Sequence, residues 1–225
     1  MNYKDERQEE TEQINRVLNV IADAVRVALV TESKDDFDNN PNARFAFLAL
    51  GNLKIEPADS DAYNNAAGIH CYGIRYGVHI QIQADRENRG WSNPKTGKIR
   101  VTLRGADVRT KTYRPKSWDV ETDPSARERV TLIAEAFADA VIRAYAKKQR
   151  QETTDAKRKR ADDLVNQVFG EWGTYKTRPT INGGRLEVSV NQWGDIVATI
   201  THRLDVDDPK TFDKLIHLKN TTKGE

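Results

Sequence analysis

The sequence predicts an α+β protein in which antiparallel β-hairpins pack on amphipathic helices. Some segments alternate apolar and polar residues, as strands with one buried face do. In other segments apolar residues recur every three or four residues, as in helices that bury one stripe. The two patterns occur in both halves of the chain. We therefore expect two hairpin-plus-helix halves, 1–122 and 123–225, either as subdomains or within one domain.

The first predicted helix follows a charged N-terminal segment. Its apolar residues recur at three- and four-residue steps and so share one helix face. They are Ile14, Val17, Leu18, Ile21, Val25, Ala28 and Leu29. A polar loop, ESKDDFDNNPN, comes next. The segment ARFAFLALGNLKIEP is apolar, but its pattern does not decide between helix and strand.

A long strand is expected over 69–85, because its even-numbered residues from Tyr72 to Ile82 are apolar and share one face. It would pair with KTGKIRVTLRG, residues 95–105, through a loop that carries Trp91. DVRTKTYRP is a candidate third strand. From the alternation we expect one set to be buried, namely Ile80, Ile82, Val101 and Leu103. We expect another set to be exposed, namely Gln81, Arg100 and Arg104.

The second half begins with a helix. Ser125 and Glu128 have the spacing of a capping box, which predicts a helix start there, and an apolar stripe runs from Val130 to Tyr145. A later stripe around Leu164 differs from it by about 120° in phase, which predicts a non-helical residue or a kink within 150–157. A second hairpin is expected from GRLEVSV and IVATITHRL, with Trp193 between them as a lid on the core. Asp208 and Pro209 would begin a closing helix.

Charge is distributed in blocks along the chain, although the formal net charge is +2. Residues 1–62 carry 7 cations and 13 acids, whereas residues 63–120 carry 11 cations and 4 acids. A second basic block, residues 140–160, has a net charge of +6. Such blocks of one sign are evidence about the charge of a binding partner and not about the type of fold.

Several classes of function have no support in the sequence. The single cysteine, Cys71, excludes an internal disulfide and a multi-cysteine metal site. The four histidines lack metal-ligand spacing, and no P-loop or dinucleotide-binding glycine motif is present. We expect no cofactor. There is no apolar signal segment or membrane-length apolar run, so we expect a cytoplasmic protein without a membrane partner.

The most basic segment is residues 86–116, with ten lysines and arginines against Glu87 and Asp107. Cations spaced along a surface bind phosphates, and aromatic rings stack on bases. The candidate nucleic-acid-binding residues are Arg75, Arg86, Arg89, Trp91, Lys95, Lys98, Arg100, Arg104, Arg109, Lys111, Arg114 and Lys116. A secondary basic face is expected on the following helix, from Arg143, Lys147, Arg150, Lys157 and Arg158.

We therefore expect a non-enzymatic protein that binds nucleic acid, DNA or RNA, through a basic hairpin face. An edge hairpin can also carry charges simply as a solvated surface. A second reading is a protein-interaction module, such as a virus-type accessory or inhibitor protein that docks on a host factor. A third is an enzyme whose site is dispersed along the sequence.

Overall fold

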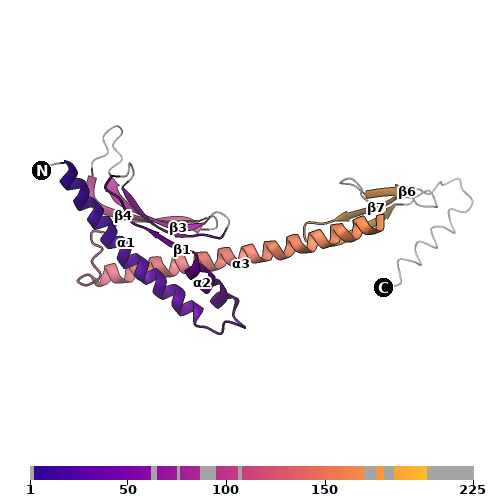
Figure 1. Cartoon of the computed structure of the whole chain (residues 1–225), viewed down its shortest axis with the longest axis horizontal. Coiled ribbons are helices and arrows are strands. Elements are labelled where there is room, and N and C mark those ends of the chain that lie inside the picture. The colour runs from indigo at the N-terminus through magenta and orange to yellow at the C-terminus, as the bar shows by residue number, and fades with distance from the viewer. Residues whose placement is uncertain are drawn as a thin grey trace, which may run out of the picture. The chain divides into compact units, whose positions relative to one another are not determined.

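The computed structural model describes residues 3–61, 65–74, 77–86, 95–105, 108–169, 176–179 and 185–201. Its helices and antiparallel sheets confirm the α+β class (Figure 1). The chain divides into two compact units, 1–150 and 151–225. The domain boundary expected after residue 122 stays a prediction. The two compact units meet within the long third helix, whose first part belongs to the first unit.

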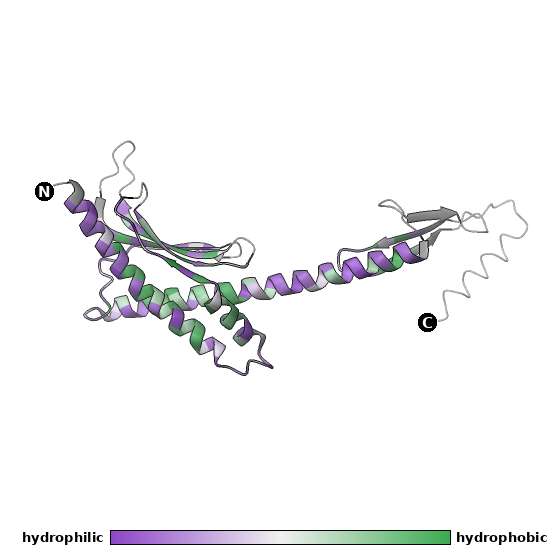
Figure 2. Cartoon of the chain, in the orientation of Figure 1, coloured by the Kyte–Doolittle hydropathy of each residue, from purple (hydrophilic) through white to green (hydrophobic). Residues whose placement is uncertain are grey.

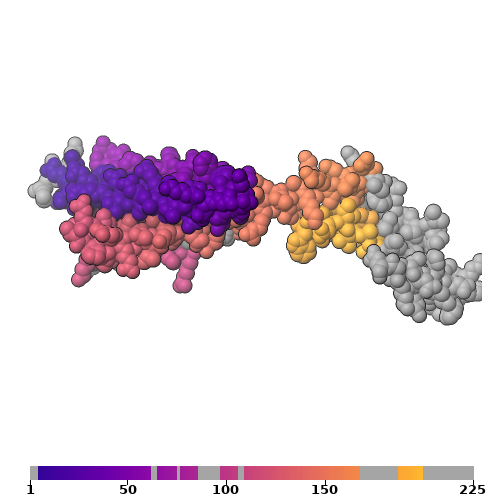
Figure 3. All heavy atoms as spheres, turned by 90° about the horizontal axis from the view of Figure 1, so that it is seen from below, coloured from indigo at the N-terminus to yellow at the C-terminus, as the bar shows by residue number. Residues whose placement is uncertain are grey.

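The first unit contains two helices, a five-stranded antiparallel meander and the start of a third helix. The helices are α1 (Tyr3–Ser33), α2 (Pro41–Gly51) and α3 (Pro124–Phe169). The strands, in spatial order, are β1 (Leu53–Glu56), β2 (Ala66–Cys71), β3 (Val78–Arg86), β4 (Lys95–Gly105) and β5 (Val108–Tyr113). Helix α1 and the first part of α3 lie side by side on one face of the sheet (Figures 1 and 3). No described helix covers the other face.

The core lies between these helices and the sheet. The expected apolar stripe of α1 is buried from Ile14 to Leu29, except that Ala28 is half-buried. Ile80, Ile82, Val101 and Leu103 are fully buried, which confirms the predicted register of β3 and β4. Each such side chain contributes about 1.5–3 kcal/mol relative to an exposed one.

The outward-facing residues are less exposed than expected. Arg104 is exposed as predicted, but Gln81 and Arg100 are half-buried. Gln81 lies on the middle strand, where Gly68 and Thr102 flank it on both sides. Arg100 is partly covered because its guanidinium lies near the carboxylate of Asp85.

The long strand expected over 69–85 is instead two strands, β2 and β3, that form a hairpin. Gly73 and Gly77 have φ of 82° and 40°, which other residues rarely adopt, so the chain reverses there. Cys71 pairs with Val78 across the hairpin, and both side chains are buried. The reversal changes the phase of the alternation. Cys71 therefore faces the core, and Tyr72 is 49% exposed.

The segment that the pattern left open contains both a helix and a strand. Asn40 caps α2 by accepting a 2.9 Å hydrogen bond from the backbone N–H of Asn42. Pro41 lies in the first turn of α2, where backbone N–H groups have no acceptor within the helix. Its nitrogen carries no hydrogen, so no hydrogen bond is lost there. Strand β1 follows α2 almost directly and forms the edge of the sheet beside β2.

Helix α3 is continuous, so the non-helical residue expected within 150–157 is absent. The change in phase has another cause. Ile133 and Phe137 are buried in the core of the first unit, whereas Ala161 and Val165 are buried in the second. Each stripe serves a different unit, and hydrophilic residues occupy the stretch between them (Figure 2). None of the helices in the described ranges combines the length and the hydropathy that a bilayer span requires.

The second unit contains the end of α3 and a three-stranded antiparallel sheet. Its strands are β6 (Lys176–Pro179), β7 (Arg185–Val190) and β8 (Ile196–Thr201), so the second hairpin is confirmed. Asp195, after the hairpin turn, forms an ion pair with Lys157 of α3. Trp193 is 63% exposed and is therefore not a lid on the core. The closing helix expected from Asp208 lies outside the described residues.

Candidate functional site

The sheet face opposite the helices carries a connected set of polar side chains, which we call the open face. Strand pairing places these residues in rows that cross the sheet. The open face consists of Lys54, Glu56, His70, His79, Gln81, Gln83, Asp85, Arg100, Thr102, Arg104, Thr112 and Arg114. Tyr72 lies at its margin, two residues beyond His70.

One row crosses four strands. Lys54 of β1 pairs with His70 of β2, which pairs with His79 of β3, and His79 pairs with Arg104 of β4. Because directly opposed residues lie about 5 Å apart, the row places an ammonium, two imidazoles and a guanidinium side by side. This row combines cations with flat rings.

The rings of this row are close together. The imidazoles of His70 and His79 have centroids 5.7 Å apart and planes inclined by 17°. The ring of Tyr72 stands 6.0 Å from that of His70, at 19°. The ammonium of Lys54 lies 5.9 Å from the centre of the Tyr72 ring. A cation at that distance is attracted to the electron-rich face of the ring.

Gly68 makes room for the imidazole of His70. A Cβ atom at Gly68 would stand 2.4 Å from Nε2 of His70, closer than any real contact. Because Gly68 has no side chain, the imidazole leans across β2 toward Glu56, which is paired with Gly68. Nε2 of His70 then lies 3.3 Å from a carboxylate oxygen of Glu56. A glycine in a strand often marks such a close approach.

Glu56 is held between two basic groups. Its second carboxylate oxygen lies 2.7 Å from Nζ of Lys54. The hydrogen bond from Lys54 is the main reason why the pKa of Glu56 is lowered, with the charge of His70 as a smaller cause. The same contact raises the pKa of Lys54. Both residues therefore stay charged at neutral pH.

His79 is held in its neutral form. Burial lowers its pKa first, and the nearby His70 and Arg104 lower it further, because each disfavours a second positive charge. At neutral pH Lys54 and Arg104 therefore flank a neutral His79 ring. Protonation of His79 would add positive charge between them.

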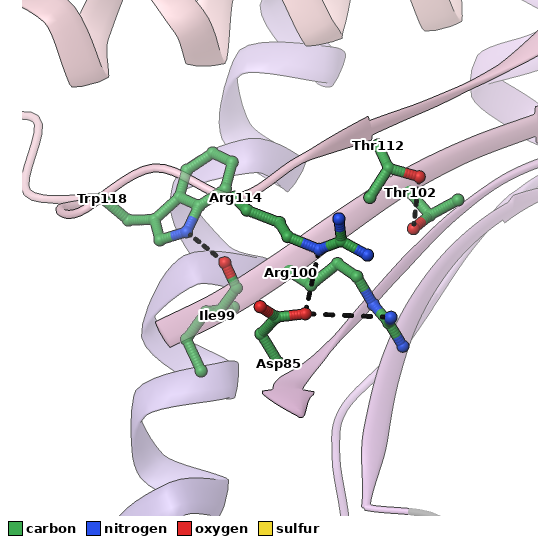
Figure 4. Close-up of polar contacts among 7 residues, drawn as sticks. All are labelled: Asp85, Ile99, Arg100, Thr102, Thr112, Arg114 and Trp118. Carbon is green, nitrogen blue, oxygen red and sulfur yellow. Dashed lines mark hydrogen bonds and ion pairs between the residues drawn. The ribbon is translucent and has the colours of Figure 1, made fainter. Parts of the chain in front are cut away.

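A second cluster surrounds Asp85, at the end of β3 (Figure 4). Its carboxylate is 9% exposed and accepts a 3.0 Å hydrogen bond from Nε of Arg114. Nη1 of Arg100 lies 3.8 Å from the same oxygen. Nearby, the indole N–H of Trp118 donates a 3.0 Å hydrogen bond to the carbonyl of Ile99, which anchors the chain beyond β5 to β4. The carboxylate partly neutralises two of the predicted cations.

The centre of the open face is uncharged. Thr102 is buried, and its hydroxyl lies 3.5 Å from that of Thr112 on β5. Gln81 lies on the other side of Thr102. Hydroxyl and amide groups separate the histidine row from the Asp85 cluster, and they can donate or accept hydrogen bonds.

Of the cations expected on the hairpin, the structure brings Arg100, Arg104 and Arg114 together on the open face. Lys98 lines a shallow groove with Glu6, Glu9 and Glu10 of α1, so it lies among acids. Lys111 pairs with the buried Leu103 and therefore belongs to the helix-covered side of the sheet, although it is exposed at the edge. Arg109 and Lys116 are exposed, on β5 and in the loop after it.

The remaining candidates of the hairpin cannot be placed. Arg75, Arg89 and Trp91 lie outside the described residues, as do the side chains of Arg86 and Lys95 at the strand ends.

The secondary basic face is divided between the two units. Arg143, Lys147 and Arg150 lie on α3 in the first unit, where Arg143 forms a 2.8 Å ion pair with Asp139. Lys157 and Arg158 lie in the second unit, where Lys157 pairs with Asp195.

Sequence reasoning missed the residues that contribute most to the row. Lys54 and Glu56 were not considered, because the type of their segment was open. The two histidines were examined as metal ligands and not as a pair. The alternation of β3 could have shown His79 on the polar face beside Arg104, but His70 needed the reversal at Gly73 to be recognised.

The described ranges offer no catalytic constellation that we can assign. No group of three or more metal-ligating side chains occurs in them. The thiol of Cys71 is buried beside the hydroxyl of Tyr145, and burial raises its pKa to about 11. A thiol with such a pKa is a poor nucleophile at neutral pH.

Comparison of the chain with protein-family models, with curated proteins and with solved structures finds no match. The function must therefore be argued from the open face itself.

Proposed function

We propose that the protein is a non-enzymatic nucleic-acid-binding protein and that the open face is its binding surface. The row of Lys54, His70, His79 and Arg104 carries the proposal. It places cations at both ends of two stacked rings on a face that no described helix covers. Phosphates and bases need this combination of positive charge and flat surface.

The net charge of the open face favours an anionic ligand. Lys54, Arg100, Arg104 and Arg114 are cationic, and Glu56 and Asp85 oppose them. Arg104 is exposed, and no ion pair of its guanidinium with a carboxylate occurs within the described residues, so its charge is available to a ligand. We assign it the main phosphate contact.

The rings favour a ligand with bases that are accessible. Tyr72 is half-exposed at the margin, beside His70. Stacking of a base on an aromatic side chain contributes about 1–3 kcal/mol to binding. It tolerates any base, because every base has a flat face. Single-stranded DNA or RNA offers such bases, whereas a duplex keeps its bases stacked.

The direct test is the salt dependence of oligonucleotide binding. Fluorescence anisotropy of a labelled single-stranded oligonucleotide would give the affinity over a range of salt concentrations. Arg104→Gln should weaken binding and make the slope of log affinity against log salt shallower by about one unit. The double variant Arg100→Gln/Arg104→Gln should reduce the slope by about one to two units. Lys111→Gln is the matched control, because it removes a cation from the helix-covered side.

A second pair of variants tests stacking. Tyr72→Ala should weaken binding by about 1–3 kcal/mol without a change in salt slope. Phe47→Ala removes an aromatic ring that is 60% exposed on α2, away from the open face, and should leave the affinity unchanged. No binding by the native protein at low salt, or an unchanged slope in the double variant, contradicts the proposal.

The same data distinguish the other two readings. An acidic protein partner of the open face would be indicated if Arg104→Gln abolished capture of that partner while no oligonucleotide bound. A dispersed enzymatic site would be indicated by metal-dependent turnover of an oligonucleotide.

A further inference from the structure

A groove lies between α1 and α3, on the helix layer of the first unit. Its volume is about 640 Å³. Helix α1 packs closely on α2 and on strands β2 to β4, but it has little close backbone contact with α3. The two helices lie side by side on this surface (Figure 3). Helices that pack directly approach to about 8–10 Å, so the separation leaves a channel between them.

Small side chains form much of this groove. Ala24 and Ala28 come from α1, and Ala134 and Ala138 come from α3. Alanines let the backbone of a third helix approach closely. Larger apolar side chains stand beside them. Ile142 is buried, whereas Val27 is 65% exposed, so the wall of the groove presents an aliphatic side chain to solvent.

The charged residues of the groove are all acidic. Glu32, Glu135 and Asp139 line it, and no lysine or arginine of the described segments does. Asp139 is paired with Arg143, but Glu32 and Glu135 have no cationic partner within the described part of the chain. Their carboxylates would attract a partner with cations on both sides of an apolar stripe.

We propose that this groove binds an amphipathic helix of a partner protein, one whose apolar stripe is flanked by lysines or arginines. The apolar side chains of that helix would lie on the alanines and Val27, at the usual i, i+3, i+4 and i+7 positions. Its cations would face Glu32 and Glu135. This inference does not depend on nucleic-acid binding, because the groove and the open face lie on opposite sides of the helix–sheet layers.

The test uses the full chain and a fluorescein-labelled synthetic helix with leucines at those four positions and lysines on both flanks. Fluorescence anisotropy should show saturable binding. A control peptide with glutamate in place of each lysine should bind at least about tenfold more weakly, because each reversal replaces an attraction by a repulsion. Equal binding of both peptides would overturn the charge argument.

Two matched pairs of variants locate the site. Glu135→Lys should weaken binding of the lysine peptide by roughly three- to tenfold, whereas Glu128→Lys, outside the groove on the same helix, should not. Val27→Asn should weaken it by about tenfold. Leu132→Asn is its control, because Leu132 is 53% exposed on α3 and does not line the groove.

The remaining outcomes would overturn the proposal. One is the absence of saturable binding by the native protein. Another is binding that neither Val27→Asn nor Glu135→Lys changes. A third is a dimer in sedimentation equilibrium that Val27→Asn dissociates, since the occupant would then be a second copy of the chain. Oligonucleotide affinity should be the same in all four variants, so failure here leaves the open face untouched.

Discussion

Arg114 donates a 3.0 Å hydrogen bond from Nε to the carboxylate of Asp85, which is almost fully enclosed. Arg100 approaches the same oxygen from the neighbouring strand. Only the carboxylate is buried, so removal of an arginine would leave it with less compensation, which costs more than the pair contributes. Asp85 therefore stabilises the open face and at the same time reduces its positive charge.

Asp85→Asn should have opposite effects on stability and on binding. The free energy of unfolding should fall by about 1–3 kcal/mol, because Arg114 would then donate to a neutral amide oxygen in place of a carboxylate. Oligonucleotide affinity should rise, because one negative charge leaves the surface. Urea unfolding and anisotropy measure the two effects. Asp162→Asn, at an exposed position of α3, is the control for stability. Weaker binding by Asp85→Asn would show that the arginines need the carboxylate for their positions.

Gly68→Ala tests the position of the His70 ring. The new Cβ would meet the far end of a flexible side chain, so the imidazole should move and the fold should remain. The free energy of unfolding should change by less than about 1 kcal/mol. NMR chemical shifts of His70 and His79 should change, since their rings would no longer lie together. Gly51→Ala is the control, because a Cβ there meets nothing within 4 Å. Unchanged histidine shifts would contradict the close approach.

The pairing of β3 with β4 could be predicted because its alternation is regular. One residue of slip would have exposed Ile80 and Val101 together. The reversal between β2 and β3 was missed because Ile74 continues the apolar phase through the turn. Gly73 and Gly77 fall inside the single strand that the alternation predicts, although paired glycines four residues apart also suit a turn.

The network of the open face could not be predicted because it is formed across strands. Glu56 and His70 meet through the pairing of β1 with β2, and no local pattern specifies that pairing. Continuity of α3 was missed for a related reason. A change in the phase of an apolar stripe indicates a change of packing partner, and a helix that serves two units meets that condition without a break.

Acidification should strengthen nucleic-acid binding and reduce stability. The pKa of His79 is lowered in the folded protein by burial and by His70 and Arg104. As pH falls below the ordinary pKa of 6.5, the unfolded chain binds the proton first, so the free energy of unfolding decreases until the folded pKa is reached.

A bound polyanion favours protonated His79. Affinity should therefore rise as pH falls from 7 to about 5.5, and His79→Gln should flatten that part of the profile. Lys54 and Arg104 stay charged throughout, and Glu56 stays ionised. A pH profile that is the same in His79→Gln would refute the assignment to His79.

The thiol of Cys71 should be unreactive in the native protein. Its pKa of about 11 leaves roughly one thiol in a thousand as thiolate at pH 8. Burial also keeps reagents away. Reaction with a disulfide reagent should be slow in buffer and fast in urea. Tyr145→Phe removes the hydroxyl that donates a 2.8 Å hydrogen bond to the carbonyl of Tyr72, and it should reduce the free energy of unfolding by about 1–2 kcal/mol. Rapid labelling of the native protein would show that the hairpin of β2 and β3 opens readily.

Gly194→Ala tests how the second hairpin packs on α3. Gly194 has a φ of 80°, and a Cβ there would stand 2.8 Å from the backbone nitrogen of Arg158. A helix backbone cannot yield as a side chain can, so the turn must move away from α3. The ion pair of Asp195 with Lys157, which lowers the pKa of Asp195, should then be lost. Gly97→Ala provides the control, because Gly97 has a φ of 72° and open space around it. That control measures the cost of the left-handed conformation alone, about 1 kcal/mol. Hydrogen exchange of β7 and β8 should accelerate in Gly194→Ala by more than exchange around β4 accelerates in Gly97→Ala. Equal acceleration in the two variants would mean that conformation, and not contact with α3, determines the cost at Gly194.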